Sequence, residues 1–222
     1  MNVRLISYSQ PSSEMTDVGI KNVQDLISFC ARVSNPGNQL NTETSENLIR
    51  FLIKHQHWSP LELTSACLEV ETTRDIARQI LRHRSFSFSE YSQRYADPTK
   101  DLHFEVRDAR LQDTKNRQNS IDVTDDVLKR QWKDRQEILL EQVKKQYEWA
   151  IENGIAKEQA RAVLPEGITV SKLYINGTLR SWVHYIQLRT DKSTQKEHRE
   201  VAVACANAIE PIFPMIKEFV NV

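Results

Sequence analysis

Glycine and cysteine are scarce in this chain of 222 residues, which contains five glycines and three cysteines. No Gly-x-Gly-x-x-Gly run and no phosphate-binding P-loop occur, so a Rossmann site for a flavin or nicotinamide is not predicted. Cys30, Cys67 and Cys205 are odd in number, far apart, and form no Cys-x-x-Cys pair. This pattern favours reduced thiols in a cytoplasm-like compartment over a disulfide framework or a zinc site.

The chain also lacks an excess of either charge, because 30 basic residues balance 30 acidic ones. No global field therefore attracts nucleic acid or an anionic membrane, and any anion site must be local. The first nine residues contain no apolar run of signal length, and no stretch reaches the ~20 apolar residues of a membrane span. His55 and His57 lack a third ligand, so no metal site is predicted. We expect a cytoplasmic protein without nucleic-acid or membrane partners.

Few glycines and prolines leave little room for linkers, so we expect one domain over residues 1–222. Residue periodicity predicts strands over 3–8, 61–72 and 168–175 and a polar loop over 10–17. It predicts helices over 18–33, 43–55, 74–84, 125–153, 158–164 and 178–188. A capping box from Thr194 to Glu197 should open a last helix, which Pro211 and Pro214 break or kink. This order, without regular βαβ alternation, indicates an α+β fold.

The long helix over 125–153 has a predicted apolar face that carries Trp132, Leu139, Val143, Tyr147 and Ile151. Gly154 is a natural stop for this helix.

The segment Arg82–Tyr95 reads Arg-His-Arg-Ser-Phe-Ser-Phe-Ser-Glu-Tyr-Ser-Gln-Arg-Tyr. Guanidinium groups bind phosphate or carboxylate through two parallel hydrogen bonds. Hydroxyls add short donors and acceptors, and the carboxylate of Glu90 can accept from a ribose hydroxyl or a ring N–H. Helical spacing places Gln79 and Arg82 on one face just before this loop. The mixture predicts a bound nucleotide, and the alternative is an arginine-rich loop solvated at the surface.

The same segment interleaves four aromatic side chains: Phe86, Phe88, Tyr91 and Tyr95. Such residues can stack on bases, so a single-stranded nucleic-acid-binding module is an alternative function. Aromatic residues near a loop more often anchor it to the core, and zero net charge provides no groove for a nucleic-acid backbone. Serines near His83 do not predict nucleophilic catalysis, because neither a Gly-x-Ser-x-Gly elbow nor an orienting aspartate is evident.

A second cationic cluster lies in the C-terminal third. Arg161 lies in Ala-Arg-Ala-Val-Leu-Pro, and Arg180 and Arg189 flank an apolar helical run. Nine helical residues rotate by roughly 900°, so these two arginines point to opposite sides of the helix. Opposed arginines on an apolar helix suit two ligands or a subunit interface.

Arg-His-Arg, then seven residues, then Ser92 resembles the signature of the flavin-dependent thymidylate synthases (ThyX), and the match extends to Glu90, Arg94 and Tyr95. Supporting matches are His57-Trp-Ser-Pro-Leu-Glu62, Ala160-Arg-Ala-Val-Leu-Pro165, and Leu179-Arg-Ser181 through Leu188-Arg189. The resemblance runs from His57 to about Arg199. One departure is Ser89, which stands where the family commonly has asparagine.

The resemblance implies an α+β fold with helices packed on a small, mostly antiparallel sheet. It implies a homotetramer whose ligand sites lie at subunit interfaces. The implied reaction converts dUMP to dTMP, with methylenetetrahydrofolate as carbon donor and FAD and NADPH as reductant.

The resemblance also implies which residues form the site. FAD-contacting positions fall on Ser59, Arg82, His83, Arg84, Glu90, Thr178, Leu179, Arg180 and His184. Positions for dUMP fall on Gln79, Arg82, Glu90, Tyr91, Ser92, Gln93, Arg94, Arg161 and Arg189. Arg189 matches the residue that activates the uracil ring and is the expected catalytic residue. No cysteine lies in these cationic motifs, so we expect no thiol nucleophile.

Overall fold

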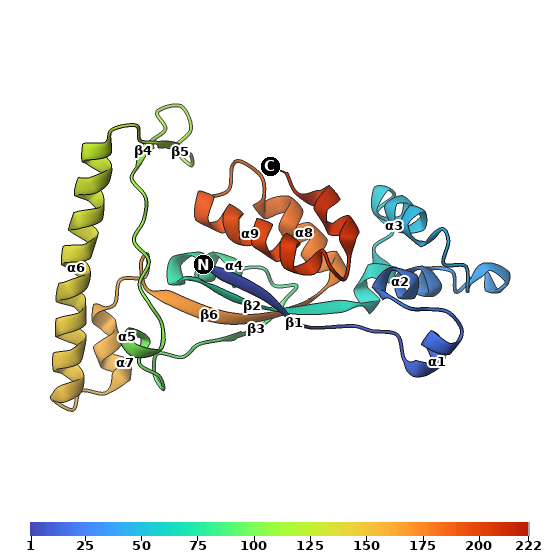
Figure 1. The fold of residues 1–222 in the computed structure, drawn as a ribbon, viewed down its shortest axis with the longest axis horizontal. Helices are drawn as coiled ribbons and strands as arrows, with labels where there is room; N and C mark the ends of the chain where they lie inside the picture. The colour runs from blue at the N-terminus through green and yellow to red at the C-terminus, as the bar shows by residue number, and fades with distance from the viewer. Residues whose placement is uncertain (222) are drawn as a thin grey trace.

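The computed structural model of the protein describes residues 1–221 and is built around a four-stranded sheet (Figure 1). The strand order is β1 (Asn2–Tyr8), β2 (Ser65–Thr73), β6 (Val170–Thr178) and β3 (Ser87–Glu90). All neighbouring strands are antiparallel. The expected α+β fold with a small antiparallel sheet is confirmed.

One face of the sheet is apolar and forms the floor of the core. Leu68 lies opposite Ile175 and Val70 opposite Leu173, and all four side chains are buried. The period of two along each strand places them on the same face. Helices α8 (Leu179–Arg189) and α9 (Lys196–Ile209) lie together on one side of the sheet (Figure 1). Their buried residues, which include Trp182 and Val201, belong to the same core cluster.

Charged side chains alternate with the apolar ones on the central strands. Arg4 on β1 lies opposite Glu69 on β2, and Arg4 Nε donates to Glu69 Oε1 at 2.7 Å. Lys172 on β6 lies opposite Glu71, and their charged atoms are 2.8 Å apart. Opposite charges directly across two strands support the register that buries the apolar face.

Short helices connect β1 to β2. They are α1 (Ser13–Asp17), α2 (Val23–Ala31) and α3 (Ser45–Lys54), with 3-10 turns at Pro36–Asn38 and Ser59–Leu63. The predicted polar loop over 10–17 is wrong where α1 forms, because the Ser12 side chain accepts from the backbone N–H of Met15 and caps that helix. Strand β2 starts later than predicted because the segment from Ser59 to Leu63 forms a 3-10 turn with Pro60 near its start.

At the end of the sheet away from α2 and α3, the chain forms α5 (Pro98–Asp101), the small hairpin β4 (Arg110–Gln112) and β5 (Ser120–Asp122), and the long helix α6 (Asp126–Glu152) (Figure 1). Helix α7 (Lys157–Ala160) and a 3-10 turn at Arg161–Val163 follow. The bounds of α6 agree with the prediction, and the Asp125 carboxylate caps it by accepting from the N–H groups of Val127 and Leu128.

The predicted apolar face of α6 is partly wrong. Val143 and Tyr147 are buried, but Trp132 and Leu139 are 43% and 50% exposed. The buried face is rotated because Gln136 occupies it. The Gln136 amide satisfies the backbone N–H and C=O of Arg107, so a polar residue is stable there and hydropathy does not reveal it.

The predicted capping box before α9 is also wrong. Gln195 occupies the N-cap position, and its side chain does not cap the helix. The Thr194 hydroxyl instead donates to the carbonyl of Leu188, and the Glu197 carboxylate binds Gln195, Arg107 and Arg110. The predicted end is confirmed, since α9 stops at Ile209 and a 3-10 turn follows at Pro214–Phe219.

Helix α4 (Arg74–Ile80) follows β2 directly and ends earlier than the predicted limit of residue 84. Among residues 1–221, no helix combines the length and apolar character that crossing a membrane would need.

Gly177 on β6 gives room to the aromatic ring that anchors the arginine-rich segment. A Cβ placed at Gly177 would lie 2.2 Å from Cδ1 of Phe86, and Phe86 is buried against Trp182 with ring centroids 4.6 Å apart. No side chain fits at position 177 unless that ring moves.

We therefore predict that Gly177→Ala lowers the free energy of unfolding by about 1–3 kcal/mol, the usual range for an overpacked core. Gly37→Ala is the matched control, because nothing lies within 4 Å of its added Cβ, and it should change stability by less than ~0.5 kcal/mol. Urea unfolding measures both variants. Equal urea midpoints for the two variants would contradict the close packing of Phe86 against Gly177.

Candidate active site

The expected catalytic arginine contacts the histidine of the arginine-rich segment. Arg189 is the last residue of α8, and its Nε donates to Nε2 of His83 at 2.9 Å. His83 must be neutral to accept this bond. Burial, and next the charge of Arg189, lower the pKa of His83 to about 4, so the ring is neutral at pH 7. Two residues more than a hundred positions apart thus form one polar pair.

Gln79 lies in the same cluster. Its Oε1 is 3.1 Å from Nδ1 of His198, and its Nε2 donates to Oε1 of Gln195 at 2.9 Å. His198 is fully buried on α9, and its Nε2 lies 3.2 Å from the Tyr185 hydroxyl. No sequence pattern indicated His198, since a single histidine on an amphipathic helix resembles an ordinary core residue. We refer to Gln79, His83, Arg189 and His198 as the arginine–histidine cluster.

A second group lies at the start of α8 and in the neighbouring 3-10 turn, and it contains five of the positions expected for FAD. Arg180 forms an ion pair with Glu62, and the Thr178 hydroxyl donates to the other oxygen of Glu62 at 2.9 Å. The hydrogen bond from Arg180 is the largest of the causes that lower the pKa of Glu62. The His184 ring contacts Trp58 edge-on at 4.4 Å between centroids. Leu179 is buried in the core, and Ser59 is exposed at the start of the neighbouring 3-10 turn.

A third group lies beyond the end of β3. Arg94 Nε donates to the carboxylate of Glu158 at 3.1 Å, and Arg161 Nε donates to the backbone carbonyl of the same residue at 3.3 Å. Both arginines, which are expected dUMP positions, therefore meet at Glu158. Glu158 was not predicted, although it lies three residues before Arg161 in a helical stretch, where such contacts are common.

Other expected dUMP residues connect the third group to the sheet. Glu90 accepts from the Ser171 hydroxyl at 2.8 Å and faces Arg74 at 3.4 Å. The Tyr91 hydroxyl donates to Asp101 at 2.9 Å, and Ser92 Oγ accepts from the N–H of Arg94 at 3.3 Å. Gln93 is buried, and its amide nitrogen has no hydrogen-bond partner among residues 1–221.

Strand β3 separates the first and third groups. Its four residues extend over roughly 13 Å, with the arginine–histidine cluster before it and the Arg94–Arg161 pair after it. Arg82 and Arg84 are exposed before the same strand, and within residues 1–221 their side chains form no hydrogen bond or ion pair. The structure thus brings the expected residues together as three groups rather than one. It also leaves two guanidinium groups available to an anion.

The aromatic residues of the segment anchor it and do not form a stacking platform. Phe86 is buried against Trp182, Phe88 packs partly buried on the core, and Tyr91 is held by Asp101. Tyr95 alone among the four is largely exposed. This arrangement argues against the alternative of a single-stranded nucleic-acid module.

Each cysteine is a poor nucleophile in this environment. Cys205 is fully buried, Cys30 and Cys67 are half-buried, and burial raises the pKa of all three thiols. A raised pKa keeps a thiol protonated at neutral pH and therefore unreactive. That the chemistry uses no thiolate stays a prediction, and the raised thiol pKa values support it.

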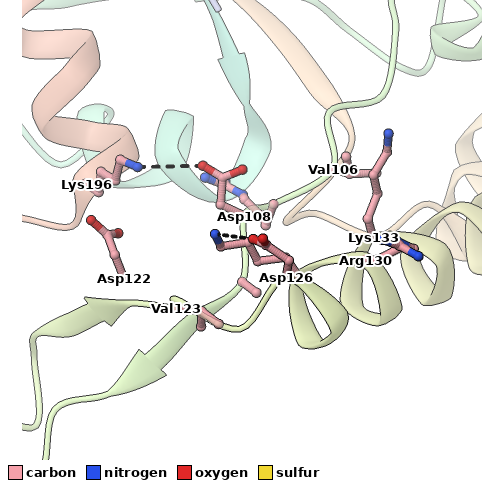
Figure 2. A pocket seen from close by; sticks show the side chains of 11 residues that line it. Val106, Asp108, Asp122, Val123, Asp126, Arg130, Lys133 and Lys196 are labelled. Atoms are coloured by element: carbon pink, nitrogen blue, oxygen red, sulfur yellow. Dashed lines mark hydrogen bonds and ion pairs between the residues drawn. The ribbon is translucent and has the colours of Figure 1, made fainter.

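A cavity of about 660 Å³ lies between α6 and the segment 106–109, and Figure 2 shows the side chains that line it. Its wall carries both charges: Lys196 lies 3.6 Å from Asp108, and Lys129 lies 2.9 Å from Asp126. None of the expected site residues lines it. Within residues 1–221, no group of three or more His, Cys, Asp or Glu side chains is arranged to hold a metal ion.

An α+β fold that gathers arginine side chains before and after strand β3 is an arrangement suited to an anionic ligand. The family model Thy1, described as thymidylate synthase complementing protein, matches residues 15–215. The probable flavin-dependent thymidylate synthase of Paramecium bursaria Chlorella virus 1 is 45% identical over 218 residues, 97% of each chain. The flavin-dependent thymidylate synthase of Synechocystis is 45% identical over 216 residues, again 97% of each.

Among solved structures, the chain is similar to the UMP/dUMP methylase PolB from Streptomyces cacaoi bound with 5-Br dUMP. The TM-score is 0.77 at 27% identity, and the match covers 98% of this chain and 93% of that chain. The protein belongs to the family of flavin-dependent thymidylate synthases.

The histidines of the site give a prediction for stability against pH. Burial is the largest cause that lowers the pKa of His83 to about 4, of His198 to about 3, and of His184 below its ordinary value. Unfolded histidines titrate near 6.5, so between about pH 6.5 and 4 the unfolded chain binds more protons than the folded one. The contribution of these histidines to the free energy of unfolding is therefore fully present above pH 6.5, and it is lost as the pH is lowered through this window.

We expect the free energy of unfolding, measured with urea, to decrease steadily from pH 7 to pH 5, before most carboxylates titrate. His83→Asn should reduce this slope, because one of the depressed groups is gone. A midpoint independent of pH between 7 and 5 would rule out buried neutral histidines.

Proposed function

We propose that the protein catalyses the reductive methylation of dUMP to dTMP, with methylenetetrahydrofolate as carbon donor and FAD and NADPH as reductant. The observation that carries this proposal is the contact between Arg189 and neutral His83 beside Gln79. It supports a guanidinium placed for a pyrimidine ring within a family named for this reaction. The 5-Br dUMP bound to the similar methylase supports the same substrate class.

Arg189 would act on the pyrimidine. Its Nε is used by His83, so both terminal nitrogens remain for a ligand. Partial ionisation of the uracil N3–H would make C5 more nucleophilic toward the folate methylene and would place negative charge on the O2–N3 side of the ring. A fixed guanidinium there stabilises that charge without having to reorganise. Because His83 is neutral, it holds the arginine in place without cancelling its charge.

The remaining dUMP positions would bind the polar parts of the nucleotide. Arg82, Arg94 and Arg161 supply cations suited to a phosphate, and Gln79, Glu90, Tyr91, Ser92 and Gln93 supply hydrogen bonds. The buried amide nitrogen of Gln93, which lacks a partner among the described residues, supports a ligand acceptor nearby.

The residues present fit FAD. The free guanidinium groups of Arg82 and Arg84 suit a diphosphate, and Glu62 fixes the direction of Arg180. Ser59, His83, Glu90, Thr178, Leu179 and His184 complete the proposed set. FAD, when bound, supplies the hydride that completes the methyl group. The protein's part is to orient three ligands, which explains why no Rossmann motif is needed.

We propose that the chain is a single domain that assembles as a homotetramer in the cytoplasm, where its three free cysteines stay reduced. The separation of the dUMP residues along β3 supports sites completed by more than one subunit. Large apolar side chains exposed on α6, namely Trp132, Ile138, Leu139 and Trp149, support a protein–protein interface there.

The assembly proposal predicts that Leu139→Lys shifts the mass measured by light scattering from that of a tetramer to a smaller species. A buried lysine in an apolar interface has no compensating partner, so association should weaken. Glu141→Lys, an exposed residue on the same helix, is the matched control for added charge and should remain tetrameric. A fully active wild-type monomer under assay conditions would refute the assembly.

The reaction itself is tested with Arg189→Ala. We expect turnover of dUMP to dTMP to fall by at least ~10²-fold, the scale seen when one preorganised donor is removed. Bound FAD, measured from its absorbance after gel filtration, should change little, because the role of Arg189 is on the pyrimidine side. Arg135→Ala, a change at an exposed residue of α6, is the control for loss of one cation. Near-normal turnover in Arg189→Ala would contradict the assignment of Arg189 as the catalytic residue. A wild-type protein that retains no FAD would contradict the proposed function.

A further inference from the structure

His198 is the centre of a hydrogen-bond chain that leaves the core and ends on a carboxylate. The Tyr185 hydroxyl lies 3.2 Å from His198 Nε2, and His198 Nδ1 lies 3.1 Å from Gln79 Oε1. Gln79 Nε2 then donates to Gln195 Oε1 at 2.9 Å, and Gln195 Nε2 donates to Glu197 Oε2 at 2.9 Å. The chain joins α8, α9 and α4, and His198 is its fully buried member.

The carboxylate at the end fixes the direction of every bond. An ionised carboxylate only accepts hydrogen bonds, and Glu197 is held ionised by Arg107 and Arg110. Gln195 must therefore turn its nitrogen to Glu197 and its oxygen to Gln79. Gln79 in turn must present its nitrogen to Gln195 and its oxygen to His198. An amide oxygen only accepts, so His198 carries its proton on Nδ1 and accepts from Tyr185 at Nε2.

This directionality determines what Gln79 offers to a ligand. Its oxygen is taken by His198 and one N–H by Gln195, so the second N–H is the group left over. Without a hold on its oxygen, the side chain of a half-buried glutamine can rotate or present its oxygen instead. A ligand atom that meets the free N–H must be an acceptor, such as a carbonyl or phosphate oxygen.

We propose that His198 is a positioning residue that holds Gln79 as a hydrogen-bond donor toward an acceptor oxygen of the nucleotide substrate. The inference rests on the proposed function for the identity of that substrate. A buried histidine is not needed for packing alone, because an apolar residue of similar size would fill the same core position without a hydrogen-bond requirement. The neutral state of the ring also agrees with the low pKa that burial gives His198.

Two substitutions of His198 each keep one of the two hydrogen bonds that its imidazole ring forms. In His198→Asn the side-chain amide nitrogen takes the place of Nδ1, so it can donate to Gln79 but does not reach Tyr185. In His198→Gln the longer side chain reaches Tyr185 and leaves Gln79 unheld. Both replace a buried ring by a smaller amide, so similar losses in melting temperature are expected for the pair.

We expect His198→Gln to raise KM for dUMP about tenfold, with kcat within about threefold of wild type and FAD content unchanged. His198→Asn should restore KM to within about threefold of wild type. Equal KM values in the two variants would overturn the proposal. If His198 had only a structural role, KM would change with stability, whichever of its two hydrogen bonds the variant keeps. If wild-type protein makes no dTMP, the proposed function fails instead, and the two outcomes are thereby distinguished.

Two further measurements do not depend on a folded His198 variant. Nitrogen-15 NMR of histidine-labelled wild type should show two neutral rings protonated on Nδ1 that are insensitive to pH from 7 down to about 5, those of His83 and His198, and His83→Asn should leave one of them. In His83→Asn, a His198 ring that is protonated on Nε2 or is an imidazolium would contradict the hydrogen-bond chain. Gln195 is exposed, so Gln195→Met removes the other hold on Gln79 without risk to the core and should raise KM at least threefold. An unchanged KM there would also overturn the proposal.

Discussion

The antiparallel pairing of β2 with β6 is the constraint on which the site depends. The two nine-residue strands pair along their whole length, and each leads directly into a helix, β2 into α4 and β6 into α8. Because the strands are antiparallel, the two helices begin at opposite ends of the pair and approach each other. Their lengths, roughly 10 Å and 16 Å, nearly span the roughly 30 Å of the strands. The residue at the end of α8, Arg189, therefore meets His83 just after α4.

Local carboxylates hold the cationic groups and explain how a cationic site exists in a chain without net charge. Glu62 holds Arg180, Glu158 holds Arg94, and Glu197 holds Arg107 and Arg110. Pairs on an exposed surface contribute little to stability, so their main effect is to fix where each guanidinium points. Arg82 and Arg84 differ, since within residues 1–221 no carboxylate binds them, and they are the cations most available to a diphosphate.

Much of the fold was predicted from residue periodicity. The predictions that were wrong failed for physical reasons. The long helix α6 and the central strands were predicted because period and turn residues agree. The buried face of α6 was not predicted, because Gln136 is buried there through its hydrogen bonds to the Arg107 backbone and is not an apolar residue. The site residues came from the family resemblance, whereas Glu158 and His198 became visible only through contacts. His198 touches Gln79 across 119 positions of sequence, a proximity that no local pattern contains.

The neighbour of Arg189 distinguishes it from the arginines that are held by a carboxylate. Arg74, Arg94 and Arg180 each face a carboxylate, whereas within residues 1–221 Arg189 is held by a neutral imidazole and forms no ion pair. A carboxylate partner would fix the guanidinium but cancel most of its field at the ligand. A neutral acceptor fixes it and leaves the field intact, as the role proposed for Arg189 beside a pyrimidine requires. The cost is that His83 and His198 must remain uncharged beside a cation, so the same arrangement that preserves the charge of Arg189 makes the fold sensitive to acid.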